Sequence, residues 1–323
     1  MTNYTGIQGQ NILIVSSDPS NPIEGQIWYN STSNLLKGYQ FATVNAWAVG
    51  GNLTTARESL GGAGTQTAGL AFGGGTPVPT KGNVTEEYDG TSWSGGGNMA
   101  TSRTSLAGLG TQTAGLAIGG GTPPRAQTEE YDGTSWTSGG NLGTGRYLLV
   151  GTGTQTAGLG FGGYSGSNLS TTEEYDGTSW TSGGNLNTAR CVMAGAGTQT
   201  AALSAGGNAP PSRNETEEYD GTSWTSGGNL NTGRSNVRGA GSQTAGLAFG
   251  GTTPTSTGAT ELYNGTTWTS NPTGLNTARG YSGSAQSAPQ SAALGFGGYV
   301  GGDVNATEEW TGAALAVRTI TTS

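Results

Sequence analysis

Residues 172–190 read TEEYDGTSWTSGGNLNTAR, and residues 216–234 repeat this text almost letter for letter as TEEYDGTSWTSGGNLNTGR. The tryptophan of each copy belongs to a series whose successive members are 43 or 44 residues apart: Trp93, Trp136, Trp180, Trp224 and Trp268. A period of this length is typical of propellers and other arrays, in which each repeat buries its apolar face against its neighbours. The regular aromatic residues therefore favour a folded chain over a disordered one, although 63 of the 323 residues are glycine.

Each repeat contains sequence for four short strands. Small and apolar residues alternate weakly through residues 113–118, a Gly-Gly pair follows, and Asp132-Gly133 supplies the positive φ that tight hairpin turns require. Apolar residues do not recur with helical spacing for long, and each glycine would cost a helix about 1 kcal/mol. We therefore predict an all-β chain of four-stranded antiparallel units, the arrangement of a β-propeller blade, with a solenoid as the alternative.

The repeat also resembles the kelch repeat in four features at fixed offsets. An arginine begins the first strand, a Gly-Gly pair ends the second, Tyr-Asp lies in the third and tryptophan opens the fourth. The resemblance covers about residues 57–310 and implies a kelch-like β-propeller. The repeat arginines are Arg57, Arg103, Arg146, Arg190, Arg234 and Arg279.

The number of blades depends on the N-terminal residues 1–51. They contain four strand-like pieces, NILIVSS, GQIWYN, LLKGYQF and AWAVGG, which predict a β-meander that serves as a degenerate first blade or an attachment segment. With the six repeats of residues 52–323, this interpretation gives the seven blades that we predict. In the alternative there are six blades, the strand of Trp47 completes the last one, and residues 1 to about 41 form a separate β appendage.

The repeated aromatic and acidic residues are best explained as scaffold. A tryptophan in every fourth strand supplies apolar area between blades that a glycine-rich sheet otherwise lacks. Adjacent residues of a strand point to opposite faces, so one glutamate of each pair should meet the repeat arginine while the other faces solvent or the next blade. Five copies of one carboxylate pair do not make the single unsymmetrical site that catalysis needs, so we predict no enzyme activity.

Composition excludes further classes of function. The chain has no histidine and one cysteine, Cys191, so His-based catalysis, thiolate clusters and an internal disulfide are excluded, and we predict neither a cofactor nor a metal site. The formal charge of −8 gives no basic surface for nucleic acid. The apolar run at residues 12–15 is too short for a signal peptide or a membrane span, which predicts no membrane insertion.

The copies differ mainly in the loops after the Gly-Gly pairs, which read GTPVPTKGNV, GTPPRAQ, YSGSNLST, NAPPSRNE, TTPTSTGA and YVGGDVNA. The TQ and DGTS turns scarcely change. In an up-and-down meander the variable loops share one face with the connections between blades, and binding residues belong disproportionately to loops on a rigid scaffold. We predict recognition on this face, with four candidate ligand-binding residues: Arg125, Tyr164, Arg213 and Tyr299.

A second resemblance concerns DPSNPIEGQIWYNSTSNLLKGY at residues 18–39, which looks like a segment near the N-termini of bacteriophage tail and fibre proteins. The GTQTA and TEEY repeats also resemble those of predicted structural proteins of aquatic bacteriophages. These resemblances imply a noncatalytic virion component, located in a tail, fibre or capsid surface, that binds neighbouring virion proteins or a host-surface glycan in a multi-copy assembly. The alternative is a secreted lectin-like or fibrous protein of a bacterial surface.

Overall fold

The computed structural model describes residues 12–22, 26–42, 45–75, 82–209 and 211–319. The chain forms two compact units, one of Ala46–Thr311 and the other of Met1–Asn45 with Gly312–Ser323. The first division precedes the expected boundary at residue 51, because the strand Ala46–Val49 belongs to the larger unit. Every regular element of the described residues is a β-strand, as predicted.

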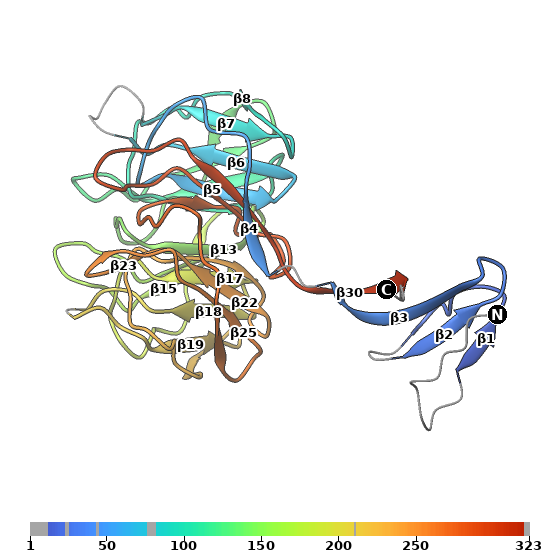
Figure 1. The fold of residues 1–323 in the computed structure, drawn as a ribbon. Helices are drawn as coiled ribbons and strands as arrows, with labels where there is room; N and C mark the ends of the chain where they lie inside the picture. Colours follow the sequence, from blue (N-terminus) through green and yellow to red (C-terminus); the bar gives the residue numbers. More distant parts are fainter. Residues whose placement is uncertain (1–11, 23–25, 43–44, 76–81, 210, 320–323) are drawn as a thin grey trace. The chain divides into compact units, whose positions relative to one another are not determined.

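The larger unit contains six four-stranded antiparallel sheets, which Figure 1 shows in colours that follow the chain. The first three are β5 (Gly61–Thr65), β6 (Ala68–Phe72), β7 (Thr85–Tyr88) and β8 (Trp93–Gly95); β9 (Ala107–Gly110), β10 (Gly115–Ile118), β11 (Thr128–Tyr131) and β12 (Trp136–Ser138); and β13 (Val150–Thr154), β14 (Ala157–Phe161), β15 (Thr172–Tyr175) and β16 (Trp180–Ser182). The others are β17 (Ala194–Gly197), β18 (Ala202–Ala205), β19 (Thr216–Tyr219) and β20 (Trp224–Ser226); β21 (Arg238–Gly241), β22 (Gly246–Phe249), β25 (Thr260–Tyr263) and β26 (Trp268–Asn271); and β27 (Gly283–Ser284), β28 (Leu294–Phe296), β29 (Thr307–Thr311) and β4 (Ala46–Val49). A small hairpin of β23 (Thr252–Thr253) and β24 (Thr255–Ser256) lies in the fifth variable loop.

These six sheets, hereafter blades 1 to 6, form a closed ring. The first strand of each blade contacts the first strand of the next, and β27 of blade 6 contacts β5 of blade 1. The outermost strand of blade 6 comes from the other end of the repeat region, since β4 pairs antiparallel with β29 and places Trp47 opposite Trp310. The ring is therefore a β-propeller closed by an N-terminal strand and not a solenoid.

The smaller unit contains the seventh four-stranded sheet, in the order β1 (Leu13–Val15), β2 (Ile27–Asn30), β3 (Leu35–Ala42) and β30 (Ala314–Thr319). β1 and β2 are parallel, whereas the other two pairs are antiparallel. The structure therefore contains the seven four-stranded sheets that the seven-blade prediction requires. The closure of the ring by the Trp47 strand is the closure that the six-blade alternative describes.

The tryptophans join neighbouring blades. Trp93, at the start of β8, donates its indole N–H to the hydroxyl of Thr307 in blade 6 at 2.9 Å, and every other blade repeats this bond to the preceding blade. The equivalent donors and acceptors are Trp136 and Thr85, Trp180 and Thr128, Trp224 and Thr172, Trp268 and Thr216, and Trp47 and Thr260. The packing role predicted for these residues is confirmed, with Trp47 as the sixth member and Trp180 only half-buried.

The two glutamates of each TEE segment have different partners. The first is buried against the repeat arginine of its own blade, as in the contact of 2.9 Å between Arg103 and Glu129. The second accepts a hydrogen bond of 2.5 Å from a tyrosine of the next blade, as Glu87 does from Tyr131. The expected division of roles is confirmed, and the second glutamate faces the neighbouring blade.

The interface between blades 5 and 6 departs from this pattern. Blade 5 has Leu262 where the other blades have their second glutamate, and blade 6 has Trp310 where they have tyrosine. Leu262 packs against the apolar cluster that contains the fully buried Trp310, whose indole N–H bonds to the carbonyl of Gln290. An apolar contact thus replaces the tyrosine–glutamate bond at the place where the ring closes.

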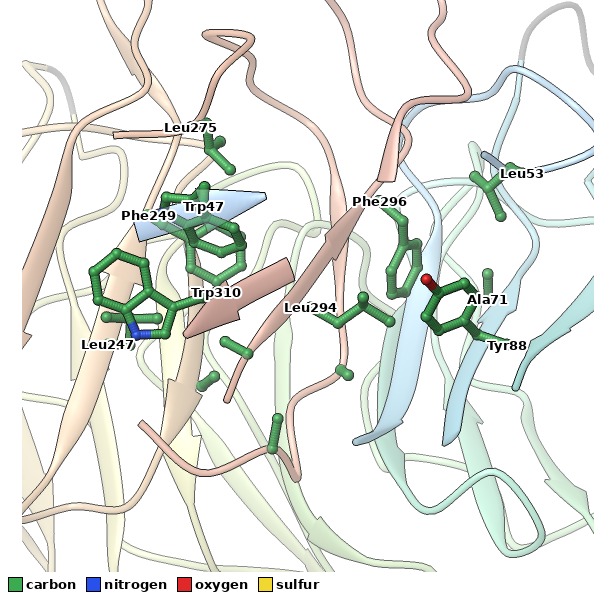
Figure 2. Packing of buried hydrophobic residues seen from close by; sticks show 14 of the residues in the cluster. Trp47, Leu53, Ala71, Tyr88, Leu247, Phe249, Leu275, Leu294, Phe296 and Trp310 are labelled. Atoms are coloured by element: carbon green, nitrogen blue, oxygen red, sulfur yellow. The ribbon is translucent and has the colours of Figure 1, made fainter. Parts of the chain in front are cut away.

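The largest apolar cluster covers this closure and reaches blade 1 (Figure 2). The Trp47 ring lies 4.7 Å from that of Phe249 in blade 5 and 5.5 Å from that of Trp310, while Phe296 packs edge-on against Trp93 of blade 1. Burial of aromatic side chains is the main source of apolar stabilisation available to such glycine-rich strands. The closing strand therefore belongs to the core of the ring.

Candidate functional site

The repeat arginines fix the variable loops. Arg57 donates one Nη to the carbonyls of Gly73 and Val84, at the two ends of its loop, while its backbone N–H bonds to Val304 in the loop of blade 6. Loops and connections between blades are thereby bonded into one surface, here called the variable-loop face. It consists of residues 75–84, 121–127, 164–171, 208–215, 252–259 and 299–306, insofar as they are described.

Tyr164 and Tyr299 occupy the same position in blades 3 and 6. The residue after each Gly-Gly pair bonds through its backbone to the residue after the repeat arginine, and in these blades the pairs are Tyr164 with Tyr147 and Tyr299 with Gly280. The two tyrosine rings of blade 3 stack edge to face at 5.5 Å, whereas the Tyr299 side chain is 39% exposed. Because blades 3 and 6 are opposite each other in a ring of six, the two candidates do not form one pocket.

Arg125 and Arg213 also share a position, in blades 2 and 4. Each backbone N–H bonds to the second glycine of its Gly-Gly pair, and each carbonyl accepts a bond of 3.0 Å from the next repeat arginine. The Arg213 side chain is already engaged, at 3.3 Å from Glu215 and 3.0 Å from the Ala209 carbonyl. Arg125 is half-buried. The four candidates are thus two pairs of equivalent positions distributed over the variable-loop face.

A ring of six residues surrounds the axis on this face. Each lies two positions after a repeat arginine and has a left-handed backbone with φ between 53° and 57°: Ser59, Ser105, Leu148, Val192, Asn236 and Tyr281. Such φ values are strained for branched or bulky residues and persist where the surroundings impose them. Four successive backbone bonds of 2.7–3.0 Å link the ring from Tyr281 through Ser59, Ser105 and Leu148 to Val192. These six residues form the mouth of an axial channel.

Two small cavities lie along the channel, and Arg238 borders both. The outer cavity is lined by the six mouth residues, and the inner one by the first strands of the blades and by Gln286. Burial lowers the pKa of Arg238 to about 10, so that its guanidinium still carries its charge at neutral pH. No carboxylate of the described residues lies within ion-pair distance of it. Arg238 was not among the site residues predicted from the sequence. The signal was present, because RSNVRGAG is the only repeat that begins with two arginines four residues apart.

An insertion in blade 6 spans the opposite end of the ring. Residues 285–290, AQSAPQ, replace the short TQ turn of the other blades. The Ser287 hydroxyl bonds to the Gly110 carbonyl of blade 2 at 2.8 Å, and the Gly241 N–H of blade 5 bonds to the Ala288 carbonyl at 2.8 Å. The axial channel therefore has its mouth on the variable-loop face and the insertion at its other end.

The acidic groups of the described residues are not arranged as metal ligands, since no three His, Cys, Asp or Glu side chains come together. Within the same residues no helix is long and apolar enough to cross a membrane.

The sequence matches no protein-family model, and the search of curated proteins gave no match.

Proposed function

We propose that this protein is a noncatalytic recognition and assembly component of a bacteriophage virion, of a tail, a fibre or the capsid surface, built on a kelch-like propeller. One observation carries the proposal: six near-identical blades form a rigid ring, and their sequence differences are concentrated in the loops of one face. A uniform scaffold with one varied face is the arrangement expected of a binding platform. The resemblance of residues 18–39 and of the repeats to phage structural proteins favours the virion.

The assignment of the carboxylates supports a noncatalytic role. When a pair of carboxyl groups performs general acid and base catalysis, both groups must be free to exchange protons with the substrate. In five blades, by contrast, the first glutamate is buried against arginine and the second accepts a bond from tyrosine. The aspartates of the DGTS turns cap their own turns, as Asp176 does by accepting the N–H groups of Thr178 and Ser179 at 2.8 Å.

The smaller unit suits attachment to a neighbouring virion protein. Asp18 organises it by accepting bonds from the side chains of Trp28, Asn30 and Lys37 at 2.6–3.1 Å, and these partners lower the pKa of Asp18 to about 2. Leu13 and Ile14, on the edge strand β1, are 49% and 70% exposed. An exposed apolar edge strand is a ready template for pairing with another chain.

Loop exchange at the tyrosines tests recognition. The double variant Tyr164→Asn/Tyr299→Asn copies Asn208, which blade 4 carries at the same position, so we expect the fold to persist while attachment of the assembled particle to host cells decreases. Weak single sites suffice for this effect, because several copies on one particle raise avidity by about 10²–10⁴. The matched control, Thr156→Asn/Ser291→Asn, alters the same two blades on the face of the TQ turns.

Attachment that falls only with the control would contradict the assignment of recognition to the variable-loop face. The virion itself is tested by mass spectrometry of purified particles, in which peptides of this chain are expected in stoichiometric amounts. Their absence from particles, together with their presence in the culture medium or on the bacterial surface, would favour the secreted lectin-like protein instead.

A further inference from the structure

Arg238 breaks the symmetry of the axial channel. The residue four positions after each repeat arginine opens the first strand, and in the other blades it is small or apolar: Gly61, Ala107, Val150, Ala194 and Gly283. Blade 5 alone places a long cationic side chain there. Because the scaffold accepts glycine or alanine at this position four times, packing of the ring does not require the arginine.

The charge of Arg238 has no counterpart in the described part of the chain. Each repeat arginine has a buried glutamate at its guanidinium, whereas the side chain of Arg238 makes one hydrogen bond, from Nε to the Ser282 carbonyl in blade 6. Its two Nη groups have no hydrogen-bond partner among the described residues. Arg238 is half-buried, so its unpaired charge remains accessible from the channel and can attract a small anion.

The mouth of the channel is altered beside Arg238. The backbone bonds that link the mouth residues stop at Val192, and the N–H groups of Asn236 and Tyr281 donate no such bond to the preceding mouth residue. These two residues belong to blades 5 and 6, between which the Arg238 side chain extends to Ser282. The ring of bonds is thus open at the position of the unpaired cation.

The groups around the inner cavity fit an anion. Besides Arg238 it is lined by Ser284 and Gln286, and the Ser284 hydroxyl, a possible donor, is buried without a partner in the described residues. The Ser284 hydroxyl and the Gln286 Nε2 can donate hydrogen bonds, whereas the Gln286 Oε1 can only accept them. Each cavity has a volume of about 20 Å³, which is room for little more than one water-sized group. A phosphate, a sulfate or a sugar is therefore too large.

We propose that Arg238, Ser284 and Gln286 form a binding site for one compact monovalent anion of the size of chloride, which enters through the mouth on the variable-loop face. This site is separate from the loop residues that the proposed function uses. The anion pairs with the half-buried guanidinium and joins blade 5 to blade 6 beside the strand that closes the ring.

The test compares thermal unfolding in sodium chloride and in sodium gluconate at equal ionic strength, since gluconate is too large for the cavity. A ligand that binds only the folded state stabilises it by mass action, and chloride at about ten times its Kd should raise the Tm by about 2–4 °C. Arg238→Ala, which copies blades 2 and 4, should abolish the difference. Arg125→Ala, which removes a half-buried arginine of the same face, should retain it.

Equal Tm values in the two salts for the unaltered protein, or an undiminished chloride effect in Arg238→Ala, would overturn the proposal. Should Arg238→Ala fail to fold, the unaltered protein alone decides. Its ³⁵Cl NMR line in dilute chloride should broaden and then narrow again on addition of bromide, which competes for the site. A line that matches that of free chloride refutes binding.

Discussion

The interface between blades 5 and 6 can be converted into the interface that the other blades use. Leu262→Glu combined with Trp310→Tyr introduces the tyrosine–glutamate hydrogen bond at the one interface where an apolar contact replaces it. The two substitutions are expected to be unfavourable singly and to compensate each other in combination. The reason is that each single variant leaves one polar group facing an apolar partner.

The magnitude follows from the contacts. Leu262→Glu alone sets a half-buried carboxylate against the Trp310 cluster with no phenolic donor, and an unsatisfied group of this kind costs about 1–3 kcal/mol or more. Trp310→Tyr alone loses the indole bond to the Gln290 carbonyl, worth about 0.5–1.5 kcal/mol, and brings an unpaired hydroxyl. The double variant regains a bond to a charged group, worth about 1.5–3 kcal/mol. A favourable coupling free energy of about 2 kcal/mol is therefore expected, within the range of contacting residues.

Urea denaturation of the four proteins of this double-mutant cycle measures the coupling. The reciprocal exchange, Glu218→Leu with Tyr263→Trp, serves as the matched control at the interface of blades 4 and 5, where the bond is 2.5 Å long. A coupling free energy near zero at both interfaces would refute the reasoning. The single effects would then be additive, which means that the two positions do not interact across the blades.

Three further outcomes are expected. Trp224→Ala should lower the free energy of unfolding by about 3–5 kcal/mol, and a denaturation midpoint equal to that of the unaltered protein would contradict the packing role. Arg103→Met should cost about 3–5 kcal/mol because it leaves Glu129 buried and unpaired, whereas Arg213→Met, at a half-exposed ion pair, should cost about 0–1 kcal/mol in the same urea titration. Burial and the bond to glutamate raise the pKa of five tyrosines, Tyr88, Tyr131, Tyr175, Tyr219 and Tyr263, to about 12. The folded state then holds protons that the unfolded state has lost above pH 10, so stability should fall between pH 10 and pH 12, and ultraviolet absorbance should show these tyrosines ionising together with unfolding rather than near pH 10.

Much of the ring could be predicted from its repetition. Equal spacing of the tryptophans predicted equivalent places in successive blades, and the alternation of side chains along a strand predicted that the two glutamates would separate. The role of Gln in the TQ turn was not predicted: Gln112, for example, donates to the Gly69 and Tyr88 carbonyls of the preceding blade. A glutamine in a turn gives no sign in the sequence of which backbone it will reach.

The departures from the repeat were harder to interpret. Trp310 stands in the sequence where the other repeats have tyrosine, but its relation to Leu262 depends on which blades are neighbours and on which strand closes the ring. Arg238 was overlooked because its difference from the small or apolar residues at the same position of the other five blades matters only in the channel. Sequence patterns indicate what the copies share, whereas the consequences of a difference require the closed ring.

Blade 6 carries the last of these departures, the insertion at residues 285–290, and its removal tests whether it holds the end of the channel. Replacing AQSAPQ by AGTQ, the corresponding residues of blade 4, keeps the glutamine that bonds to blade 5 and deletes the bonds to Gly110 and Gly241. Two hydrogen bonds of about 0.5–1.5 kcal/mol each predict a loss of about 1–3 kcal/mol. The loss should come with faster amide hydrogen exchange at Gly241, whose N–H bonds to the insertion. Unchanged exchange at that amide would mean that the insertion does not stabilise the end of the channel. An insertion that holds the channel end must protect the Gly241 N–H, to which its carbonyl is bonded.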